Sequence, residues 1–471
     1  MTHTHEFFID GAWVRATGEA RARVVNPAEE TPLAEVALAS RTDVDRAVAA
    51  AARAFEHFAH SSIAERAALL ERLLQAYRPR AQELARTLVA EVGAPAALAA
   101  GQVKVGEAHI TTMLEVLRRF EFTESRGAFD IVREPVGVCA LITPWNAPVG
   151  QVLCKLVPAL AAGCTVVAKP SEVTPLSTLI LGEILEASAM PRGVVNLLNG
   201  DGPQAGAALS AHPAVDMVSF TGSVRGGVAV AQAAAPTVKR VVQELGGKSA
   251  NIILRDADLE QAVRKGVTAC CFHSGQACAA PTRMLVPRES LASAAQLAAQ
   301  AARQLKVGPP TASDTQLGPL VNRAQFERVR GYIRQGIAEG ARLVAGSHER
   351  PAHLRRGYFV EPTVFADVDP AMAIAQEEIF GPVLCLIGYD TEADAIRIAN
   401  GTVYGLAAYV CGSVPHAREI ASQLRAGYVS INYPPWNPSA PFGGYKRSGN
   451  GRQYAEHGLM EHLEMKSIVV G

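Results

Sequence analysis

The sequence has no excess of either charge and no long apolar run. Lysine and arginine together number 45, and aspartate and glutamate also number 45, so no net charge attracts nucleic acid or a membrane surface. The longest predominantly apolar run, residues 156–168, is too short to cross a bilayer. The first residues show no basic segment followed by an apolar core, which a secretory signal requires. We therefore expect a cytoplasmic protein with neither a nucleic-acid partner nor a membrane partner.

The chain also lacks the cysteine spacings of disulfide-rich and zinc-binding proteins. None of its eight cysteines belongs to a C-x-x-C pair, and no nearby histidine supplies the spacing of a zinc finger. This pattern is typical of a reducing compartment and predicts no metal site. All the cysteines except Cys278 are interpreted as small buried hydrophobic residues, namely Cys139, Cys154, Cys164, Cys270, Cys271, Cys385 and Cys411.

What the chain does have is length and apolar content. Its 471 residues exceed the size of a single core, and 49% of them are hydrophobic, so two or three domains are expected. An alanine-rich helical pattern dominates roughly the first hundred residues. From residue 136 onward, five short apolar strands alternate with helices, at 136–142, 165–168, 194–198, 217–220 and 240–245. This alternation predicts an α/β fold with a parallel, doubly wound sheet of the dinucleotide-binding type.

A second α/β block is expected from residue 246 to about residue 446. Its apolar strand candidates lie at 251–253, 284–286, 383–387, 407–410 and 428–431. A cleft forms naturally at the junction of two such blocks, and ligands bind preferentially at junctions of this kind.

Two chemically reactive side chains lie on either side of this junction. Cys278 ends the run Ser-Gly-Gln-Ala-Cys, and Glu244 lies 34 residues upstream in the run Glu-Leu-Gly-Gly-Lys. A thiol adds readily to a carbonyl carbon, and a carboxylate can take a proton from that thiol or from an attacking water. The pair therefore predicts covalent catalysis on a carbonyl substrate.

Several shorter patterns at strand ends suit a dinucleotide. The run 220–223, Phe-Thr-Gly-Ser, ends a predicted strand and begins a helix, whose N-terminus can hold a phosphate. Gly202 belongs to a second glycine cluster before a helix, and spacing alone does not decide between the two clusters. Glu172 follows the second strand, where a carboxylate suits ribose hydroxyls and favours NAD over NADP. Each pattern by itself is equally typical of an ordinary turn.

Two further residue runs carry polar or aromatic groups suited to a site. Asn146 follows the first strand, where its amide can donate to a developing oxyanion, although a turn asparagine is the commoner role. In the run 377–382, Glu378 can meet a second ribose and Phe380 a flat nicotinamide. Taken in isolation, Phe380 is more typical of a core residue. The order of all these motifs along the chain is more informative than any one of them.

In that order the motifs resemble the aldehyde dehydrogenase superfamily, in its NAD(P)-dependent hydrolytic branch. The similarity runs from Phe-Ile-Asp-Gly at residues 8–11 to Pro-Phe-Gly-Gly-Tyr-Lys at 441–446 and on through residues 449–452. The resemblance implies oxidation of an aldehyde to the carboxylic acid with NAD(P)+, through a thiohemiacetal and a thioester on Cys278. It implies Glu244 as the general base and Asn146, together with the backbone N–H of Cys278, as the oxyanion donor.

The same resemblance implies the cofactor and its contacts. The cofactor is NAD, with NADP as the alternative. The residues implied to bind it are Ile142, Thr143, Trp145, Lys169, Ser171, Glu172, Gly202, Phe220, Thr221, Gly222, Ser223, Leu245, Glu378 and Phe380.

The resemblance further implies three structural parts. These are a dinucleotide-binding domain (1–119 and 135–245), a catalytic domain (246–446) and a small β oligomerisation flap (120–134 and 447–471). Residues 464–469 are expected to form an edge strand, which a partner chain tends to pair with. We therefore expect a homodimer or a homotetramer.

One departure from the family pattern concerns proton transfer. Many members carry glutamate directly after the Gly-Arg near the C-terminus, whereas this chain has Gln453, which leaves Glu244 as the main base. Small residues around Cys278, with Trp436 nearby in the chain, indicate an apolar pocket for a medium-sized or ring-bearing aldehyde. Two alternatives stay open: a CoA-acylating dehydrogenase, whose members usually lack the Glu244 equivalent, and a non-catalytic structural member of the same fold.

Overall fold

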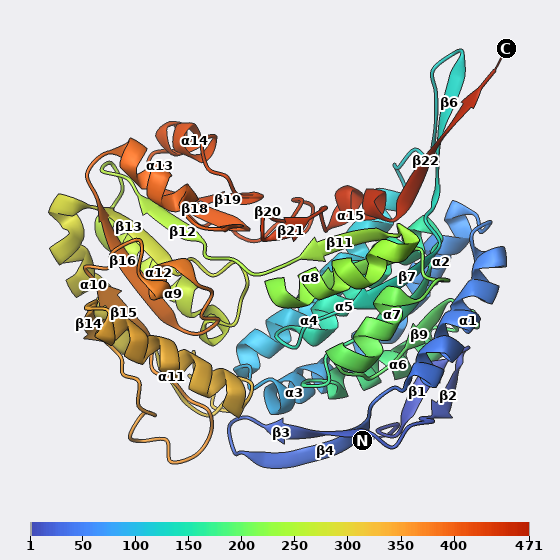
Figure 1. The fold of residues 1–471 in the computed structure, drawn as a ribbon, viewed down its shortest axis with the longest axis horizontal. Helices are drawn as coiled ribbons and strands as arrows, with labels where there is room; N and C mark the ends of the chain where they lie inside the picture. Colours follow the sequence, from blue (N-terminus) through green and yellow to red (C-terminus); the bar gives the residue numbers. More distant parts are fainter. Residues whose placement is uncertain (1, 471) are drawn as a thin grey trace.

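Two β-sheets, each packed against helices, form the two halves of the molecule (Figure 1). The computed structural model describes residues 2–470. None of the helices in that range combines the length and the apolar character that a membrane crossing demands.

The first sheet is built on five parallel strands in the order β9-β8-β7-β10-β11. The chain winds from β7 outward to β9 and then returns to the other side of β7, so the winding direction reverses between β7 and β10. Ligands of doubly wound sheets bind outside the carboxyl ends of the strands at such a reversal. The strands are β7 (Val138–Ile142), β8 (Thr165–Lys169), β9 (Val195–Leu197), β10 (Met217–Thr221) and β11 (Arg240–Glu244).

Both faces of this sheet are covered, as the near-continuous apolar strands predict. Alternate residues of β7 point to opposite faces: Leu141 belongs to one core cluster and Ala140 to another. The helices of this half are α1 (Arg41–Phe58), α2 (Ile63–Tyr77), α3 (Ala81–Glu91), α4 (Ala96–Leu117), α5 (Pro148–Ala162), α6 (Leu176–Ala187), α7 (Ala207–Ala211), α8 (Val224–Ala234) and α15 (Ala455–Glu461).

The expectation of a helical N-terminal region needs correction for residues 6–37. These residues form two antiparallel hairpins, and the helices begin only at Arg41, where Ser40 caps α1. The hairpins are β1 (Glu6–Ile9) with β2 (Ala12–Arg15), and β3 (Arg21–Asn26) with β4 (Thr31–Ala37). The first hairpin extends the sheet beyond β9, and the short β21 (Gly449–Asn450) extends it beyond β11.

The second sheet has the order β14-β15-β16-β13-β12-β18-β19. The five predicted strands are present, as β12 (Ala250–Ile253), β13 (Arg283–Pro287), β16 (Val383–Tyr389), β18 (Ala407–Cys411) and β19 (Tyr428–Ile431). Two strands at one edge were not predicted, β14 (Arg342–Ala345) and β15 (Thr363–Ala366). The helices of this half are α9 (Leu259–Cys271), α10 (Leu291–Gln304), α11 (Arg323–Ala338), α12 (Ala373–Gln376), α13 (Glu392–Asn400) and α14 (Val414–Ala421), and β17 (Tyr404–Gly405) pairs with β20 (Tyr445–Lys446).

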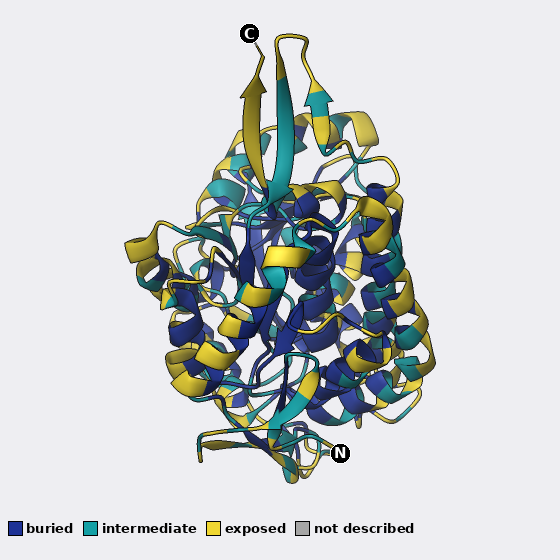
Figure 2. Cartoon of the chain, turned by 90° about the vertical axis from the view of Figure 1, so that its right-hand side faces the viewer, coloured by how far each residue is buried: buried dark blue, intermediate teal, exposed yellow. Residues whose placement is uncertain are grey.

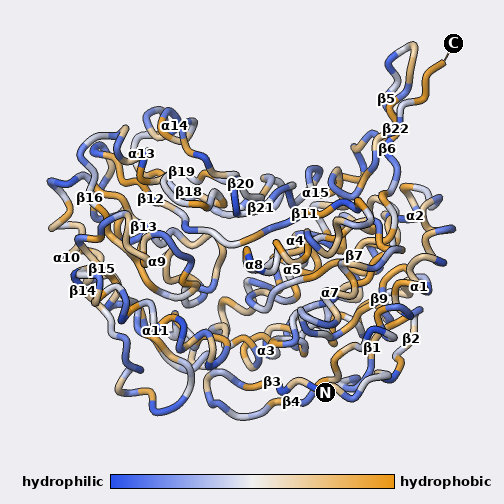
Figure 3. Tube along the Cα trace, viewed as in Figure 1, coloured by the Kyte–Doolittle hydropathy of each residue, from blue (hydrophilic) through white to orange (hydrophobic). Residues whose placement is uncertain are grey.

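A three-stranded sheet projects beyond the first half, as Figures 1 and 2 show. It has the order β22-β6-β5, from β22 (Leu463–Val469), β6 (Phe129–Pro135) and β5 (Thr123–Ser125). Met465 and Val469 on β22 are 74% and 77% exposed, and Figure 3 shows hydrophobic residues at this end of the chain. Within residues 447–470, β22 pairs with β6, whereas β21 pairs with β11 and α15 packs on α5.

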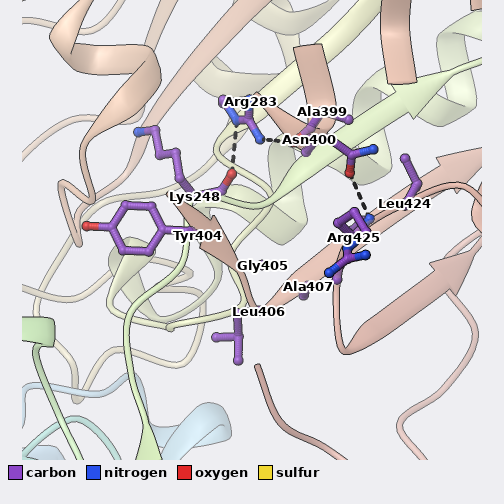
Figure 4. Close-up of a pocket in the computed structure, with 13 residues that line it drawn as sticks. Lys248, Arg283, Ala399, Asn400, Tyr404, Gly405, Leu406, Ala407, Leu424 and Arg425 are labelled. Atoms are coloured by element: carbon purple, nitrogen blue, oxygen red, sulfur yellow. Dashed lines mark hydrogen bonds between the residues drawn. The ribbon is translucent and has the colours of Figure 1, made fainter. Parts of the chain in front are cut away.

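A buried arginine fixes the connection between the two halves. Arg283, at the start of β13, donates to the carbonyl oxygens of Lys248, Ile398 and Ala399 at 2.8–2.9 Å. Figure 4 shows Arg283 beside Lys248 and Ala399. A buried guanidinium is tolerated when its N–H groups are hydrogen-bonded in this way. The segment that leads from Glu244 into β12 is therefore held against the second sheet.

Candidate active site

The carboxyl edge of the first sheet brings the predicted residues of that half together. Ile142, Lys169, Thr221 and Glu244 are the last residues of β7, β8, β10 and β11. The other predicted residues of this half lie next to these strand ends: Thr143, Trp145 and Asn146 after β7, Ser171 and Glu172 after β8, Phe220, Gly222 and Ser223 beside the end of β10, and Leu245 after β11. Parallel strands place their carboxyl ends at one edge, so residues far apart in sequence line one surface on both sides of the reversal between β7 and β10.

The N-terminus of α8 is shaped to accept a group close to its backbone. Ser223 caps the helix and its Oγ accepts from the Gly226 N–H at 3.1 Å. A Cβ at Gly222 or Gly226 would lie 2.6 or 2.8 Å from the ring of Phe220, so a side chain at either position would force that ring to move. The bare backbone and the positive end of the helix dipole are suited to a phosphate.

Buried polar atoms that have no hydrogen-bond partner among residues 2–470 gather along the same edge. They include the hydroxyls of Thr143 and Thr221 and both amide atoms of Asn199, a residue that follows β9 and was not predicted. Lys169 donates to the carbonyl oxygens of Pro170 and Gly200 at 2.9 and 2.7 Å and keeps its third proton available. Unpaired buried polar groups are costly, so their presence fits a ligand rich in hydroxyls and phosphates.

Residues of the second half complete this surface. The rings of Trp145 and Phe380 meet edge to face, with centroids 5.3 Å apart. Glu378 accepts a hydrogen bond from the Gly247 N–H at 3.1 Å, three residues after Glu244. Burial raises the pKa of Glu378 to about 7, against the opposing effects of that N–H, Arg328 and Lys248. Glu378 and Phe380 therefore lie across the junction from the strand ends of the first sheet.

The loop before Cys278 is held in a strained conformation. His273 and Ser274 both adopt left-handed backbone angles, with φ of 54° and 55°, which non-glycine residues rarely take. The His273 Nε2–H donates to the Asn146 carbonyl at 2.7 Å, and the Asn146 side-chain amide donates to the Gln276 carbonyl at 3.0 Å. These two bonds tie Asn146 to the loop, and the second amide proton of Asn146 stays available. Neither the strain nor the contribution of His273 was predicted.

Cys278 differs from the other seven cysteines because it is partly exposed, whereas they are buried, as predicted. A Cβ on Gly247 would lie 2.7 Å from the Cys278 carbonyl oxygen, so the segment after Glu244 packs directly on the loop that contains Cys278. Burial of the sulfur, with the carboxylates Glu378 and Glu244 nearby, raises the pKa of the Cys278 thiol to about 12. The thiol therefore needs a proton acceptor before it can attack.

Glu244 has the environment of such an acceptor. It is 3% exposed, and neither carboxyl oxygen has a hydrogen-bond partner among residues 2–470. Burial raises the pKa of Glu244 to about 8, with Lys155 and Arg452 opposing the shift. Lys155, which was not predicted, is itself buried and donates to Ser219 Oγ at 3.1 Å.

Gln453 also lies at this site. Its side-chain carbonyl accepts from the Cys154 thiol at 3.7 Å, and its backbone exchanges hydrogen bonds with Phe442. The side chain is a neutral amide and carries no second base, so Glu244 is the carboxyl group that this part of the site supplies.

A doubly wound sheet whose ligand edge faces a partly exposed cysteine and a buried carboxyl group has the architecture of an α/β enzyme that binds a dinucleotide. The model of the Aldehyde dehydrogenase family matches residues 13–468, so the chain belongs to this family. It is 50% identical, over 100% of its length and 99% of the relative, to 3-succinoylsemialdehyde-pyridine dehydrogenase from a Pseudomonas species.

Solved structures give the same assignment. A mutant of aldehyde dehydrogenase C from Pseudomonas syringae, in complex with NAD+ and octanal, superposes with a TM-score of 0.99 at 52% identity, covering 100% of this chain and 97% of that one. The NAD+ complex of aldehyde dehydrogenase from Bacillus cereus gives a TM-score of 0.95 at 39% identity, covering 99% and 96%. The predicted fold class and enzyme class are confirmed.

Proposed function

We propose that this protein oxidises an aldehyde to its carboxylic acid through a covalent intermediate on Cys278, with NAD+ as the hydride acceptor. The contact of Gly247 with the Cys278 carbonyl carries this proposal, because it brings the partly exposed thiol to the end of β11, where Glu244 lies. The NAD+ complexes of two related structures support the choice of cofactor.

The residues of the chain account for both covalent steps. Cys278 Sγ forms a bond to the aldehyde carbon as Glu244 takes the thiol proton, and the oxyanion accepts from the Cys278 N–H and the free amide proton of Asn146. When bound, NAD+ supplies the acceptor for the hydride that leaves the carbon, and a thioester remains. Glu244 releases the thiol proton to solvent and then takes a proton from water, whose oxygen bonds to the thioester carbon as the carbon–sulfur bond breaks. The leaving thiolate recovers a proton from Glu244. The products are the acid and the regenerated thiol.

The edge residues of the first sheet fit the dinucleotide. Ser223 and the α8 backbone suit the pyrophosphate, and Lys169 with Glu172 suits the adenosine ribose. Glu378 accepts from ribose hydroxyls on the nicotinamide side, where Phe380 and Trp145 provide flat surfaces. The carboxylate of Glu172 opposes a 2′-phosphate, which favours NAD over NADP.

The substrate is proposed to be a medium-sized apolar or ring-bearing aldehyde. The related structure with octanal and the relative named for a pyridine semialdehyde both support this class. The division into domains at residues 119, 135, 245 and 446 and the homodimeric or homotetrameric state stay predictions. The exposed apolar edge of β22 supports a homo-oligomer, and light scattering of the purified protein measures the number of subunits.

The proposal is tested with an aldehyde panel, both cofactors, and the variant Cys278→Ala. The wild type is expected to form NADH with or without CoA, because Glu244 provides for hydrolysis. Cys278→Ala should form none while binding NAD+ with unchanged affinity in calorimetry. NADH formation by Cys278→Ala would exclude this nucleophile, and strict dependence on CoA would replace hydrolysis by acyl transfer.

A further inference from the structure

Three aromatic side chains near the site form a cluster that has no role in the covalent steps. His109 on α4 lies 5.0 Å from the ring of Tyr454 and 5.7 Å from that of Trp436, measured between ring centroids. Tyr454 and Trp436 are 6.0 Å apart and perpendicular. We call His109, Trp436 and Tyr454 the ring cluster.

The ring cluster connects the general base with the surface. Tyr454 stacks on Phe442 at 5.6 Å, and a Cβ on the next residue, Gly443, would lie 2.9 Å from Glu244 Oε1. At the other end, Trp436 is 43% exposed. The rings therefore follow one another from the neighbourhood of Glu244 to solvent, which is the path an aldehyde with an extended tail would occupy.

His109 is an unusual member of such an aromatic surface because it brings two polar atoms. It is 7% exposed, and burial alone lowers its pKa to about 4, with no hydrogen bond to either ring nitrogen among residues 2–470. Neither nitrogen belongs to the fully enclosed unpaired atoms of that range, so both reach open space. A neutral imidazole offers one N–H donor and one lone pair.

We propose that His109 is a specificity-determining residue that hydrogen-bonds a neutral heteroatom on the ring of a ring-bearing aldehyde, while Trp436 and Tyr454 pack against that ring. This inference rests on the proposed function and narrows its substrate class. The preferred aldehyde carries a planar ring with one hydrogen-bonding atom, such as a pyridine nitrogen, separated by a short chain from the aldehyde carbon.

The physical basis is the cost of leaving the imidazole unpaired. A ring without a heteroatom displaces water from His109 and gives no hydrogen bond in return, whereas a matching ring replaces that water. One neutral hydrogen bond of this kind corresponds to about a tenfold difference in kcat/KM between two substrates of the same shape.

The experiment compares 3-(pyridin-3-yl)propanal with 3-phenylpropanal, with octanal as a substrate that has no ring. The wild type should prefer the pyridyl substrate about tenfold in kcat/KM, mainly through KM. His109→Phe keeps the aromatic surface and should lower kcat/KM for the pyridyl substrate to that for 3-phenylpropanal, and octanal reports any change that is common to all substrates. His109→Gln can still form the hydrogen bond and should keep part of the preference. The control His57→Phe replaces an exposed imidazole on α1 and should behave as the wild type.

Equal losses on both ring substrates in His109→Phe would overturn the inference, because a purely structural residue acts on all substrates alike. Equal kcat/KM for the two ring substrates in the wild type would overturn it as well. Oxidation of octanal in either case leaves the proposed function intact. Failure of the wild type to oxidise any aldehyde overturns the proposed function and this inference together.

Discussion

Glu244→Gln should remove both the turnover and the main pH dependence of the enzyme. With a pKa of about 8, the Glu244 carboxyl is only about one tenth ionised near pH 7 and about nine tenths ionised near pH 9. If it is the base for hydrolysis of the thioester, the steady-state rate should rise about tenfold between these two pH values. The physical reason is burial without a hydrogen-bond partner, which disfavours the ionised form.

Stopped-flow recording of NADH separates the two covalent steps. In Glu244→Gln, NADH should form slowly, because the thiol has lost its proton acceptor, and should stop after at most one NADH per active site, because the amide cannot take a proton from water. Mass spectrometry of the intact chain should show the acyl group on Cys278. A glutamine keeps the size of the side chain, so binding of aldehyde and NAD+ should be little changed.

Glu461→Gln is the matched control. Glu461 is one of the groups that raise the Glu244 pKa, and it accepts a hydrogen bond from the Arg452 N–H at 2.8 Å. Its neutralisation should shift the pH profile toward lower pH while keeping the tenfold amplitude. A flat wild-type profile, or an identical profile in Glu244→Gln, would refute the role of Glu244 in hydrolysis.

Three further predictions concern the thiol, the oxyanion and the cofactor. Alkylation of Cys278 by iodoacetamide should be slow without cofactor, because a pKa of about 12 leaves about a thousandfold less thiolate than an ordinary cysteine. Glu378→Gln should accelerate this reaction, measured by mass spectrometry, because Glu378 is the carboxylate that most strongly opposes the thiolate. Asn146→Ala should lower kcat by about a hundred- to a thousandfold with a small change in KM, measured in steady-state assays. Glu172→Ser should raise kcat/KM with NADP relative to NAD by about tenfold, measured with both cofactors on one aldehyde.

Each of these has an outcome that contradicts its basis. Alkylation of the free enzyme at the rate of a small thiol would mean that the sulfur is already ionised. A rise in KM with unchanged kcat for Asn146→Ala would assign the residue to substrate binding. If the ratio of kcat/KM with NADP to that with NAD is unchanged in Glu172→Ser, the adenosine ribose does not bind beside Glu172.

Site residues could be predicted where the sequence immediately around them determines their position. Glu244, Ser223 and Lys169 each stand where an apolar strand ends, and the order of strands and helices determines which edge they share. Cys278 could be distinguished from the other cysteines by its glycine-containing loop, and it is the one that is partly exposed. Local pattern was sufficient wherever a strand end determined the position of the side chain.

Residues whose roles depend on distant contacts could not be predicted. The hydrogen bond from His273 to Asn146 joins positions 127 residues apart, and the pairing of Lys155 with Ser219 joins positions 64 apart. The strands β14 and β15 were not predicted, whereas β12 and β19, which also have four residues each, were, so strand length alone does not account for the difference. Tertiary contacts, rather than local propensity, place these elements.

The unpaired carboxyl of Glu244 connects the function with the stability of the fold. Its folded-state pKa is raised from the ordinary value of 4.5 to about 8, so ionisation favours the unfolded chain as the pH rises between these values. One pKa unit corresponds to about 1.36 kcal/mol, so the free energy of unfolding falls by as much as about 5 kcal/mol over this pH range. Glu244→Gln should therefore unfold at a higher temperature than the wild type near pH 8, and the difference should shrink toward pH 4.5. Thermal unfolding at both pH values measures it, and a difference independent of pH would mean that Glu244 is not buried in an uncompensated state.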